Sequence, residues 1–453
     1  MNEFISLADK TLATRLGYKI NFDVVRRTIN INSKKIIIYY LSSLVSNDLV
    51  NDILESIYRD NFICNGSIDI ENDINIVELK INSGMMAILY FDEDKYKVID
   101  IRNYPNRSSV EPESEKSLKG SHDGFTEHML INTALIRRRI KTRDFRCELL
   151  NIGELSKTYV NLYYIENRVN KKVYQEIKNL LNNLKIDSLV MADRALAELL
   201  FKQTFNVFPV VRFSERPDIV AISILQGYLV IMVDNSPSAI IVPTTFFELN
   251  QQPMEYHFSP IISSATRLLR YFCILISLFL VPLWLLVAMN KDLTIPFLIY
   301  SQNTSNVSLF IQILIVQIFL SLIRLASFNT PGILATSMSL AATIILSEVG
   351  ANIGIVSPEI VFYCCLSSIA NFSIPSFEVS RALTIWNFII IIAVGLFYKI
   401  GFIVSVFLLF LSLVCVRNFH SAYLYPFIPF NLKDLINSLI RLSNDSKYTT
   451  KVK

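Results

Sequence analysis

Polar side chains recur at helical spacing inside the apolar C-terminal part of the chain. Gln317, Ser321 and Arg324 follow an i, i+4, i+7 spacing and therefore share one helix face. A second stripe carries hydroxyl groups and ends at a carboxylate: Thr336, Ser339, Thr343, Ser347 and Glu348. Because polar groups are costly against lipid, both stripes are expected to face protein or water. Such a stripe lines a narrow ion path, or it is the small-residue face by which helices pack closely; the sequence leaves both open.

Charged residues gather in the N-terminal part instead. A basic cluster, residues 136–143, contacts phosphates of nucleic acid or lipid headgroups, forms a solvated helix end, or makes intersubunit ion pairs with the acidic segment 111–115. We favour ion pairs, because the two segments are close in sequence and no aromatic residues for base stacking lie between the arginines. A role in assembly or coupling, within or between subunits, is therefore assigned to Glu113, Asp123, Glu127, Arg137, Arg138, Arg139, Arg216 and Asp218.

Enzyme signatures are missing from the sequence. It contains no GxGxxG, GxxxxGK[ST], GxSxG or HExxH motif, and residues 153–158 imitate a phosphate loop without its first glycine or its spacing. The four histidines are scattered, and no CxxC pair occurs among the six cysteines. We therefore expect no catalytic residues, no cofactor and no metal. The formal charge of +4 does not indicate a nucleic-acid partner.

The elements that must position these residues include a membrane region. Hydrophobic residues make up 52% of the chain and charged residues 18%, and most of the charge precedes Arg270. Apolar runs occupy residues 272–289, 307–323, 333–347, 360–374, 385–400 and 402–416. A membrane helix needs about 20 apolar residues, so the short middle pair either spans in tight packing or re-enters. The last two runs, separated near Lys399, are typical of a helical hairpin.

The N-terminal part shows a strand-and-helix alternation that occurs twice. Residues 35–40 and 159–165 are β-rich runs, each followed by a helical pattern, at 48–57 and 172–184. Each half then has two short β-runs joined by a polar turn. We expect two related cytoplasmic α/β subdomains followed by a bundle of four to six transmembrane or re-entrant helices. The predicted boundaries are 1–20 for an N-terminal segment, 21–130 and 131–265 for the subdomains, 266–418 for the membrane region and 419–453 for a cytoplasmic tail.

Several ordered motifs resemble the GerA family of spore germination proteins. They cover residues 102–107, 111–115, 120–127, 135–140, 214–218, 236–237, 243–247 and 267–271. The resemblance extends from about Phe22 to Phe430. Residues 324–338 and 423–430 resemble one branch of the family more than the A subunits of nutrient receptors, which usually carry a glutamate near the arginine that corresponds to Arg324. Lys119 replaces an arginine that is usual in the family, and the charge is kept.

The resemblance implies a multi-pass protein of the spore inner membrane whose N-terminal portion faces the cytoplasm or spore core. It further implies an A-type subunit that forms or gates an oligomeric ion channel and releases monovalent cations during germination. The expected partners are the lipid bilayer, further copies of the chain, a second membrane protein and other germination proteins. Two alternatives remain: a scaffold that assembles germination proteins without conducting, and a secondary transporter with discontinuous helices.

Overall fold

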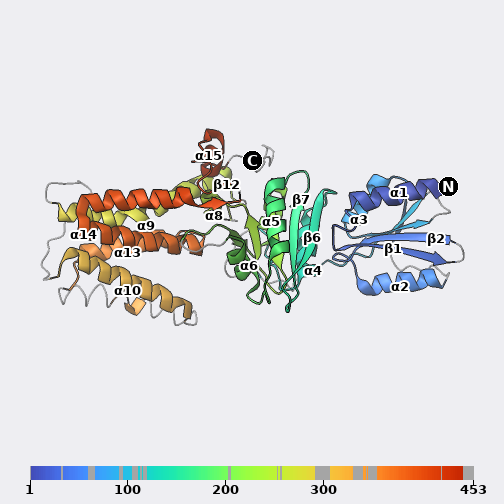
Figure 1. Ribbon diagram of the computed structural model, residues 1–453, viewed down its shortest axis with the longest axis horizontal. Coiled ribbons are helices and arrows are strands. Elements are labelled where there is room, and N and C mark those ends of the chain that lie inside the picture. The colour runs from blue at the N-terminus through green and yellow to red at the C-terminus, as the bar shows by residue number, and fades with distance from the viewer. Residues whose placement is uncertain are drawn as a thin grey trace.

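The chain folds into three bodies that follow one another along its length, two sheet-containing subdomains and a helical bundle (Figure 1). The computed structural model describes residues 2–31, 34–59, 67–90, 95–104, 111–112, 115, 120–201, 206–252, 254–255, 258–290, 307–329, 340–342, 344, 355–419 and 421–441.

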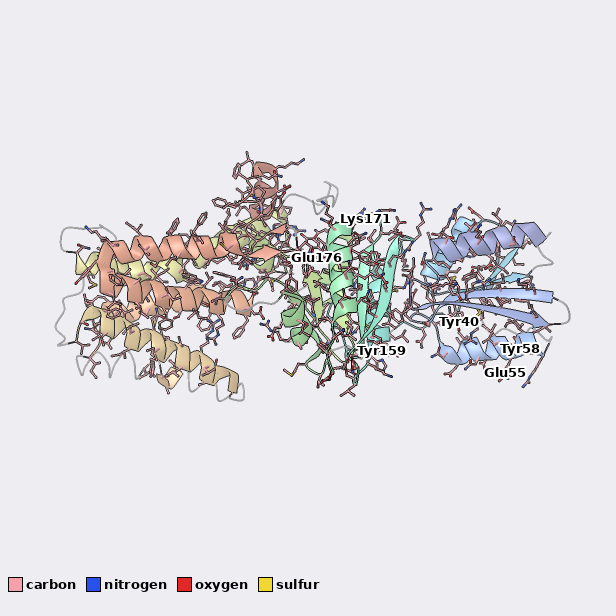
Figure 2. The ribbon with its side chains drawn as sticks, in the orientation of Figure 1. Tyr40, Glu55, Tyr58, Tyr159, Lys171 and Glu176 are labelled. Atoms are coloured by element: carbon pink, nitrogen blue, oxygen red, sulfur yellow. The ribbon has the colours of Figure 1, made fainter. Side chains whose placement is uncertain are left out.

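The first subdomain is a five-stranded antiparallel sheet with helices on its faces. Its elements are α1 (Asn2–Arg15), β1 (Val24–Ile31), β2 (Lys34–Leu41), α2 (Asn47–Tyr58), β3 (Ile68–Glu71), α3 (Ile74–Asn82), β4 (Met86–Tyr90) and β5 (Tyr96–Ile99). The strand order is β1-β2-β4-β5-β3. Helix α2 forms because apolar residues recur at helical spacing: it buries Val50, Ile53 and Ile57 against the sheet. Its polar side, with Glu55 and Tyr58, faces outward (Figure 2).

The second subdomain repeats this design. Its elements are α4 (Met129–Arg139), β6 (Phe145–Ile152), β7 (Thr158–Ile165), α5 (Lys171–Asn183), α6 (Ala192–Phe201), β8 (Arg212–Ser214), α7 (Pro217–Gln226), β9 (Leu229–Val233), β10 (Ala239–Val242) and α8 (Phe246–Leu249). The strand order β6-β7-β9-β10-β8 matches that of the first sheet position by position. The registers also agree, since Met86 pairs with Ile99 in β4–β5 and Leu229 with Val242 in β9–β10. The predicted pair of related subdomains is confirmed.

Each repeat begins with a helix that the sequence patterns did not predict. In the first subdomain, Leu12 of α1 and Leu16 just after it pack into the core of the sheet, so residues 2–20 lie within this subdomain. In the second, α4 occupies the corresponding place. The correspondence extends to one contact: Tyr39 of β2 donates a hydrogen bond to Asp9 of α1, and Tyr163 of β7 shares one with Thr133 of α4.

The bundle consists of α9 (Pro260–Met289), α10 (Leu309–Asn329), α13 (Pro358–Phe372) and α14 (Phe377–Cys415). In the part of the chain that the structure describes, α9, α10 and α14 are long and apolar enough to cross a membrane. Short elements follow, β11 (Arg417–Asn418), β12 (Ser421–Ala422) and α15 (Leu432–Leu439), and they return to the second subdomain and the start of α9. Residues 417–441 and the second subdomain therefore lie at the same end of the bundle (Figure 1).

Helix α14 is a hairpin and not one straight rod. Tyr398 leaves the helical conformation, with φ of 52°. A side-chain carbon at Gly401 would collide with the carbonyl oxygen of Ala393, so the chain after the break lies directly against the chain before it. A straight helix of 39 residues would measure about 58 Å, roughly twice the hydrocarbon thickness. The predicted hairpin near Lys399 is confirmed by this reversal.

Candidate functional site in the bundle and its junction with the second subdomain

Arg324 ties three helices together at the end of the bundle that faces the second subdomain. From α10, its Nη1 donates to Oδ1 of Asn371 on α13 at 3.0 Å, and its Nη2 donates to Oγ of Ser380 on α14 at 2.8 Å. The guanidinium carbon also lies 4.6 Å from the ring centroid of Phe372. Its hydrogen bonds thus go to neutral groups. A charged side chain at this depth is retained because interhelical bonds satisfy it.

The remaining members of the first predicted stripe stay on the same helix, α10. Gln317 is buried, and Ser321 is partly exposed toward a groove between α10 and α14. Of the other predicted residues, Thr336, Ser339, Thr343, Ser347, Glu348 and Glu113 lie outside the described residues. Their roles remain predictions.

Helices α10 and α13 run parallel to each other. Near the start of α10, Gln312 accepts a hydrogen bond from the backbone N–H of Ser357 at 2.9 Å. Near its end, Arg324 reaches Asn371 close to the end of α13. The predicted segment 333–347 lies between these two helices in the sequence and falls mostly outside the described residues.

Glu255 anchors the start of α9. Its carboxylate is 2% exposed and accepts hydrogen bonds from both Arg267 and Arg270 of α9. Arg270 also donates to the carbonyl oxygen of Asn250 at 2.6 Å. From the tail, Arg441 donates to the carbonyl oxygen of Phe258 at 2.9 Å. One buried carboxylate thus fixes the first turns of a membrane helix to the segment that leaves the second subdomain.

Both ends of the α14 hairpin are fixed to the same subdomain. At its start, Arg194 of α6 forms an ion pair of 2.5 Å with Glu378. At its end, the buried Asn418 donates to the carbonyl oxygen of Thr244 at 3.0 Å and to that of Val210. These contacts attach the start of α9 and both ends of the α14 hairpin to the second subdomain.

A cavity of about 430 Å³ lies at this junction. Arg212 and Glu115 line it from the subdomain side, and Glu378 lines it from α14. Burial raises the pKa of Glu115, although its hydrogen bonds with Ser214 and the charge of Arg212 oppose the rise. The junction therefore combines partly desolvated charges of both signs.

Within the basic cluster, Arg137 joins the two subdomains. Its guanidinium makes two hydrogen bonds with the carboxylate of Asp23, at 2.6 and 2.7 Å, and both side chains are almost fully buried. Ser43 of the first subdomain also donates to Asp23 at 2.8 Å. Burial raises the pKa of Asp23, but the charge and hydrogen bonds of Arg137 outweigh burial and hold it below its usual range. This bidentate pair is an inter-subdomain clamp.

The other predicted assembly residues make contacts within the chain. Arg139 pairs with Asp123 at 2.6 Å, and Arg138 is exposed with its guanidinium 5.5 Å from the ring centroid of Tyr104. Glu127 is exposed. Arg137 and Arg139 thus pair with Asp23 and Asp123, and among the described residues of the segment 111–115 neither forms an ion pair with Glu111 or Glu115.

That acidic segment lies beside a different arginine. Arg216 is fully buried, pairs with Asp218 at 2.8 Å and lies 3.6 Å from Glu111. It also donates to the carbonyl oxygens of Glu115 and Ser121 at 3.0 Å each. These contacts hold Glu111, Glu115 and Ser121 beside the N-terminal end of α7.

Sequence reasoning did not single out Asp23, Glu255, Asn371 or Asn387. The amide of Asn387 donates to the carbonyl oxygens of Ser277 and Leu278 on α9 at 3.0 Å each. Asn371 and Asn387 are polar residues inside apolar runs, a signal that marks helix contacts. In the described part of the chain, no group of three or more His, Cys, Asp or Glu side chains is placed to hold a metal ion.

Replacing Arg324 by alanine is expected to destabilise the bundle by about 1–2 kcal/mol, because two interhelical hydrogen bonds are lost. Leu325→Ala is the control, since Leu325 is the next residue of α10 and is 55% exposed. The measurement is thermal unfolding of the full chain in detergent. Equal losses of stability in the two variants would show that Arg324 does not hold the helices together.

The chain is similar in sequence to known spore germination and sporulation proteins. A profile described as Bacillus/Clostridium GerA spore germination protein matches residues 10–451. Stage V sporulation protein AF of Bacillus subtilis is 31% identical over 94% of this chain and 90% of its own length. Spore germination protein KA of the same organism is 26% identical over 96% and 84%. The motifs at 324–338 and 423–430 predict greater similarity to the first of these, and the identities confirm it.

Among solved structures, a similar chain is the N-terminal domain of the A subunit of the Bacillus megaterium spore germinant receptor GerK3. It covers 52% of this chain and 93% of its own length, with 27% identity and a TM-score of 0.40. The match of the family profile over nearly the whole chain establishes the relationship. This chain is a membrane protein of the GerA family of spore germination proteins.

Proposed function

We propose that this chain is an A-type subunit that forms or gates an oligomeric channel and releases monovalent cations during germination. The proposal rests on the contacts between the second subdomain and the membrane helices. The second subdomain is bonded to the start of α9 through Glu255 and to both ends of α14 through Arg194 and Asn418. An element that holds several membrane helices at once is suited to change their arrangement together.

The proposed location is the spore inner membrane, with the N-terminal subdomains facing the cytoplasm or spore core. Arg267 and Arg270 support this orientation, because basic residues beside a span favour the cytoplasmic side and these two lie at the subdomain end of α9. The proposed partners are further copies of the chain, a second membrane protein and other germination proteins. The names of the relatives, which are spore germination and sporulation proteins, support this setting.

The proposed path uses the hydroxyl stripe that ends at Glu348. A single helix cannot enclose a pore, so several copies would each supply the same stripe around a common axis. Hydroxyl and carbonyl oxygens there would replace part of the hydration of a cation, and Glu348 would raise the local cation concentration. Gln317 would extend the polar surface along α10, and Arg324 would fix that helix in place, whereas Ser321 faces the groove between α10 and α14.

Thr343→Val in the full chain is expected to slow potassium flux from liposomes about fivefold, because one hydroxyl worth about 1 kcal/mol is lost at similar side-chain volume. Thr343→Ser is the matched control, since it keeps the hydroxyl and should retain the flux. Oligomer size measured in the same detergent shows that assembly survives.

The same experiment separates the alternatives. Absence of flux from correctly assembled wild-type protein would favour a scaffold, and saturable exchange kinetics would favour a transporter. A cysteine at Thr343 that resists water-soluble thiol reagents in a conducting assembly would remove this stripe from the path.

A further inference from the structure

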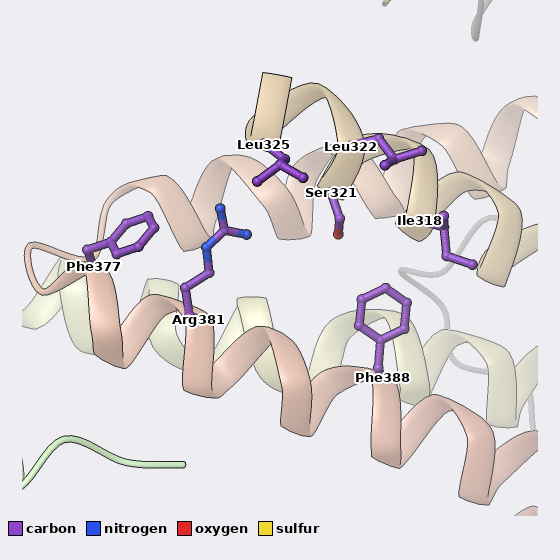
Figure 3. A pocket seen from close by; sticks show the side chains of 7 residues that line it. All are labelled: Ile318, Ser321, Leu322, Leu325, Phe377, Arg381 and Phe388. Carbon is purple, nitrogen blue, oxygen red and sulfur yellow. The ribbon is translucent and has the colours of Figure 1, made fainter. Parts of the chain in front are cut away.

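A groove of about 480 Å³ lies between α10 and the first leg of α14, and its lining is mostly apolar. Leu322 and Leu325 form the α10 wall, and Phe388 forms part of the α14 wall (Figure 3). Two polar side chains also line it: the hydroxyl of Ser321 and the guanidinium of Arg381 both point into the gap (Figure 3). The groove thus combines a long apolar surface with a cationic group.

The positive charge is concentrated at one end of the groove. The guanidinium carbons of Arg381 and Arg324 lie 4.9 and 5.9 Å from the ring centroid of Phe377, so two cations flank one side chain. Within the described residues, no carboxylate forms an ion pair with Arg324. The nearby Glu378 is paired with Arg194 of the second subdomain. This end of the groove therefore favours an anion.

The depth of each group fits the layers of a bilayer. Phe377 begins α14 at the subdomain end of the bundle, and Arg381 follows about one turn, or 6 Å, further in. Phe388 lies about 10 Å deeper than Arg381 along the same helix. If α14 spans the bilayer, the Arg381 guanidinium would lie at the level of lipid phosphates and the apolar walls would continue into the hydrocarbon region.

We propose that this groove binds an anionic phospholipid. Its phosphate lies against Arg381 and the positive end of the groove, and one acyl chain follows Leu322 and Phe388 toward the bilayer centre. Basic pockets between membrane helices bind anionic headgroups because the attraction is only weakly screened there. A monovalent cation is repelled by the same arginines, so this groove is separate from the proposed cation path.

The test is a thermal-shift titration of the purified full chain in detergent with phosphatidylglycerol, phosphatidylcholine or inorganic phosphate. Wild-type protein is expected to show a larger rise in Tm with phosphatidylglycerol than with either other ligand. Arg381→Gln should weaken apparent binding of phosphatidylglycerol about fivefold, the factor expected for one charge beside an anionic lipid. Arg381→Lys should restore most of the binding, and Lys433→Gln, an exposed charge outside the groove, should change nothing.

A separate variant tests whether the apolar walls of the groove contact the acyl chain. Leu322→Trp should fill the groove and weaken binding of both lipids while the circular dichroism spectrum stays unchanged. Equal binding of phosphatidylglycerol by wild type and Arg381→Gln would overturn the proposal. If inorganic phosphate raised the Tm as much as phosphatidylglycerol does, the groove would be an anion site that does not bind a lipid, and the proposal would be wrong. Crosslinking of Leu322→Cys between two copies would make another subunit the occupant and would likewise refute it.

Discussion

Replacing Arg137 by alanine is expected to lower the free energy of unfolding of the N-terminal subdomains by about 3–5 kcal/mol. Removal of the arginine leaves the carboxylate of Asp23 buried at 0% exposure without its bidentate partner, and an uncompensated buried charge costs about this amount. The two subdomains would also lose this bidentate contact. Pulse proteolysis of the full chain across a urea gradient measures the loss.

Arg138 provides the matched control, because it belongs to the same helix and carries the same charge. Its side chain is exposed beside Tyr104, so Arg138→Ala should change the unfolding free energy by less than about 1 kcal/mol. Similar losses for the two variants would contradict the clamp.

The same pair has a defined pH dependence. Because the pKa of Asp23 is lower in the folded chain than in the unfolded one, its contribution is present above about pH 4. It is lost as the pH falls through the lower, folded pKa. The difference in stability between wild type and Arg137→Ala should therefore shrink on acidification.

Replacing Glu255 by alanine is expected to destabilise the junction by a similar amount, about 3–5 kcal/mol. Arg267 and Arg270 would remain buried at 4% and 6% exposure without the carboxylate they share. The start of α9 should then detach from the second subdomain. Trypsin cleavage after Arg267 or Arg270 in detergent-solubilised protein reports this detachment, because both sites are protected in the intact junction.

Glu198→Ala is the control for this experiment. Glu198 pairs with Arg194 on the surface of α6 with 62% of its side chain exposed, and such pairs contribute at most about 1 kcal/mol. If Glu255→Ala leaves the protease pattern and the thermal unfolding as unchanged as Glu198→Ala does, the junction depends on other contacts.

Some elements were predictable because their side chains follow a simple period. The β-rich run at 35–40 became β2, and apolar spacing marked α5, where Val173, Ile177 and Leu181 are buried. Helix α4 gave no such signal, because it buries Asn132, Thr133 and Arg137 among its apolar residues. Strand β1 was also missed, since Arg26 and Arg27 interrupt its apolar pattern.

The partners of the charged residues in the candidate site were likewise not predictable from the sequence. Arg137 was assigned ion pairs, but its partner Asp23 is 114 positions away, whereas the acidic segment at 111–115 is closer in sequence. Sequence distance carries no information on which carboxylate a fold brings near. Glu255 was not predicted either, because its role depends on α9 packing beside it. A single glutamate in a polar segment has no pattern that would distinguish it.

The reversal of α14 at Tyr398 means that a tilt at the two ends of the hairpin would displace its tip by a larger distance. Both ends of the hairpin, at Glu378 and Asn418, contact the second subdomain, so a tilt of the subdomain is expected to tilt the two legs together. The first leg is about 30 Å long. A tilt of about 5° at these ends therefore moves the tip at Tyr398 by roughly 3 Å. Because the tip lies at the end of the bundle away from the junction, a small tilt at the two ends of the hairpin would produce a larger displacement there.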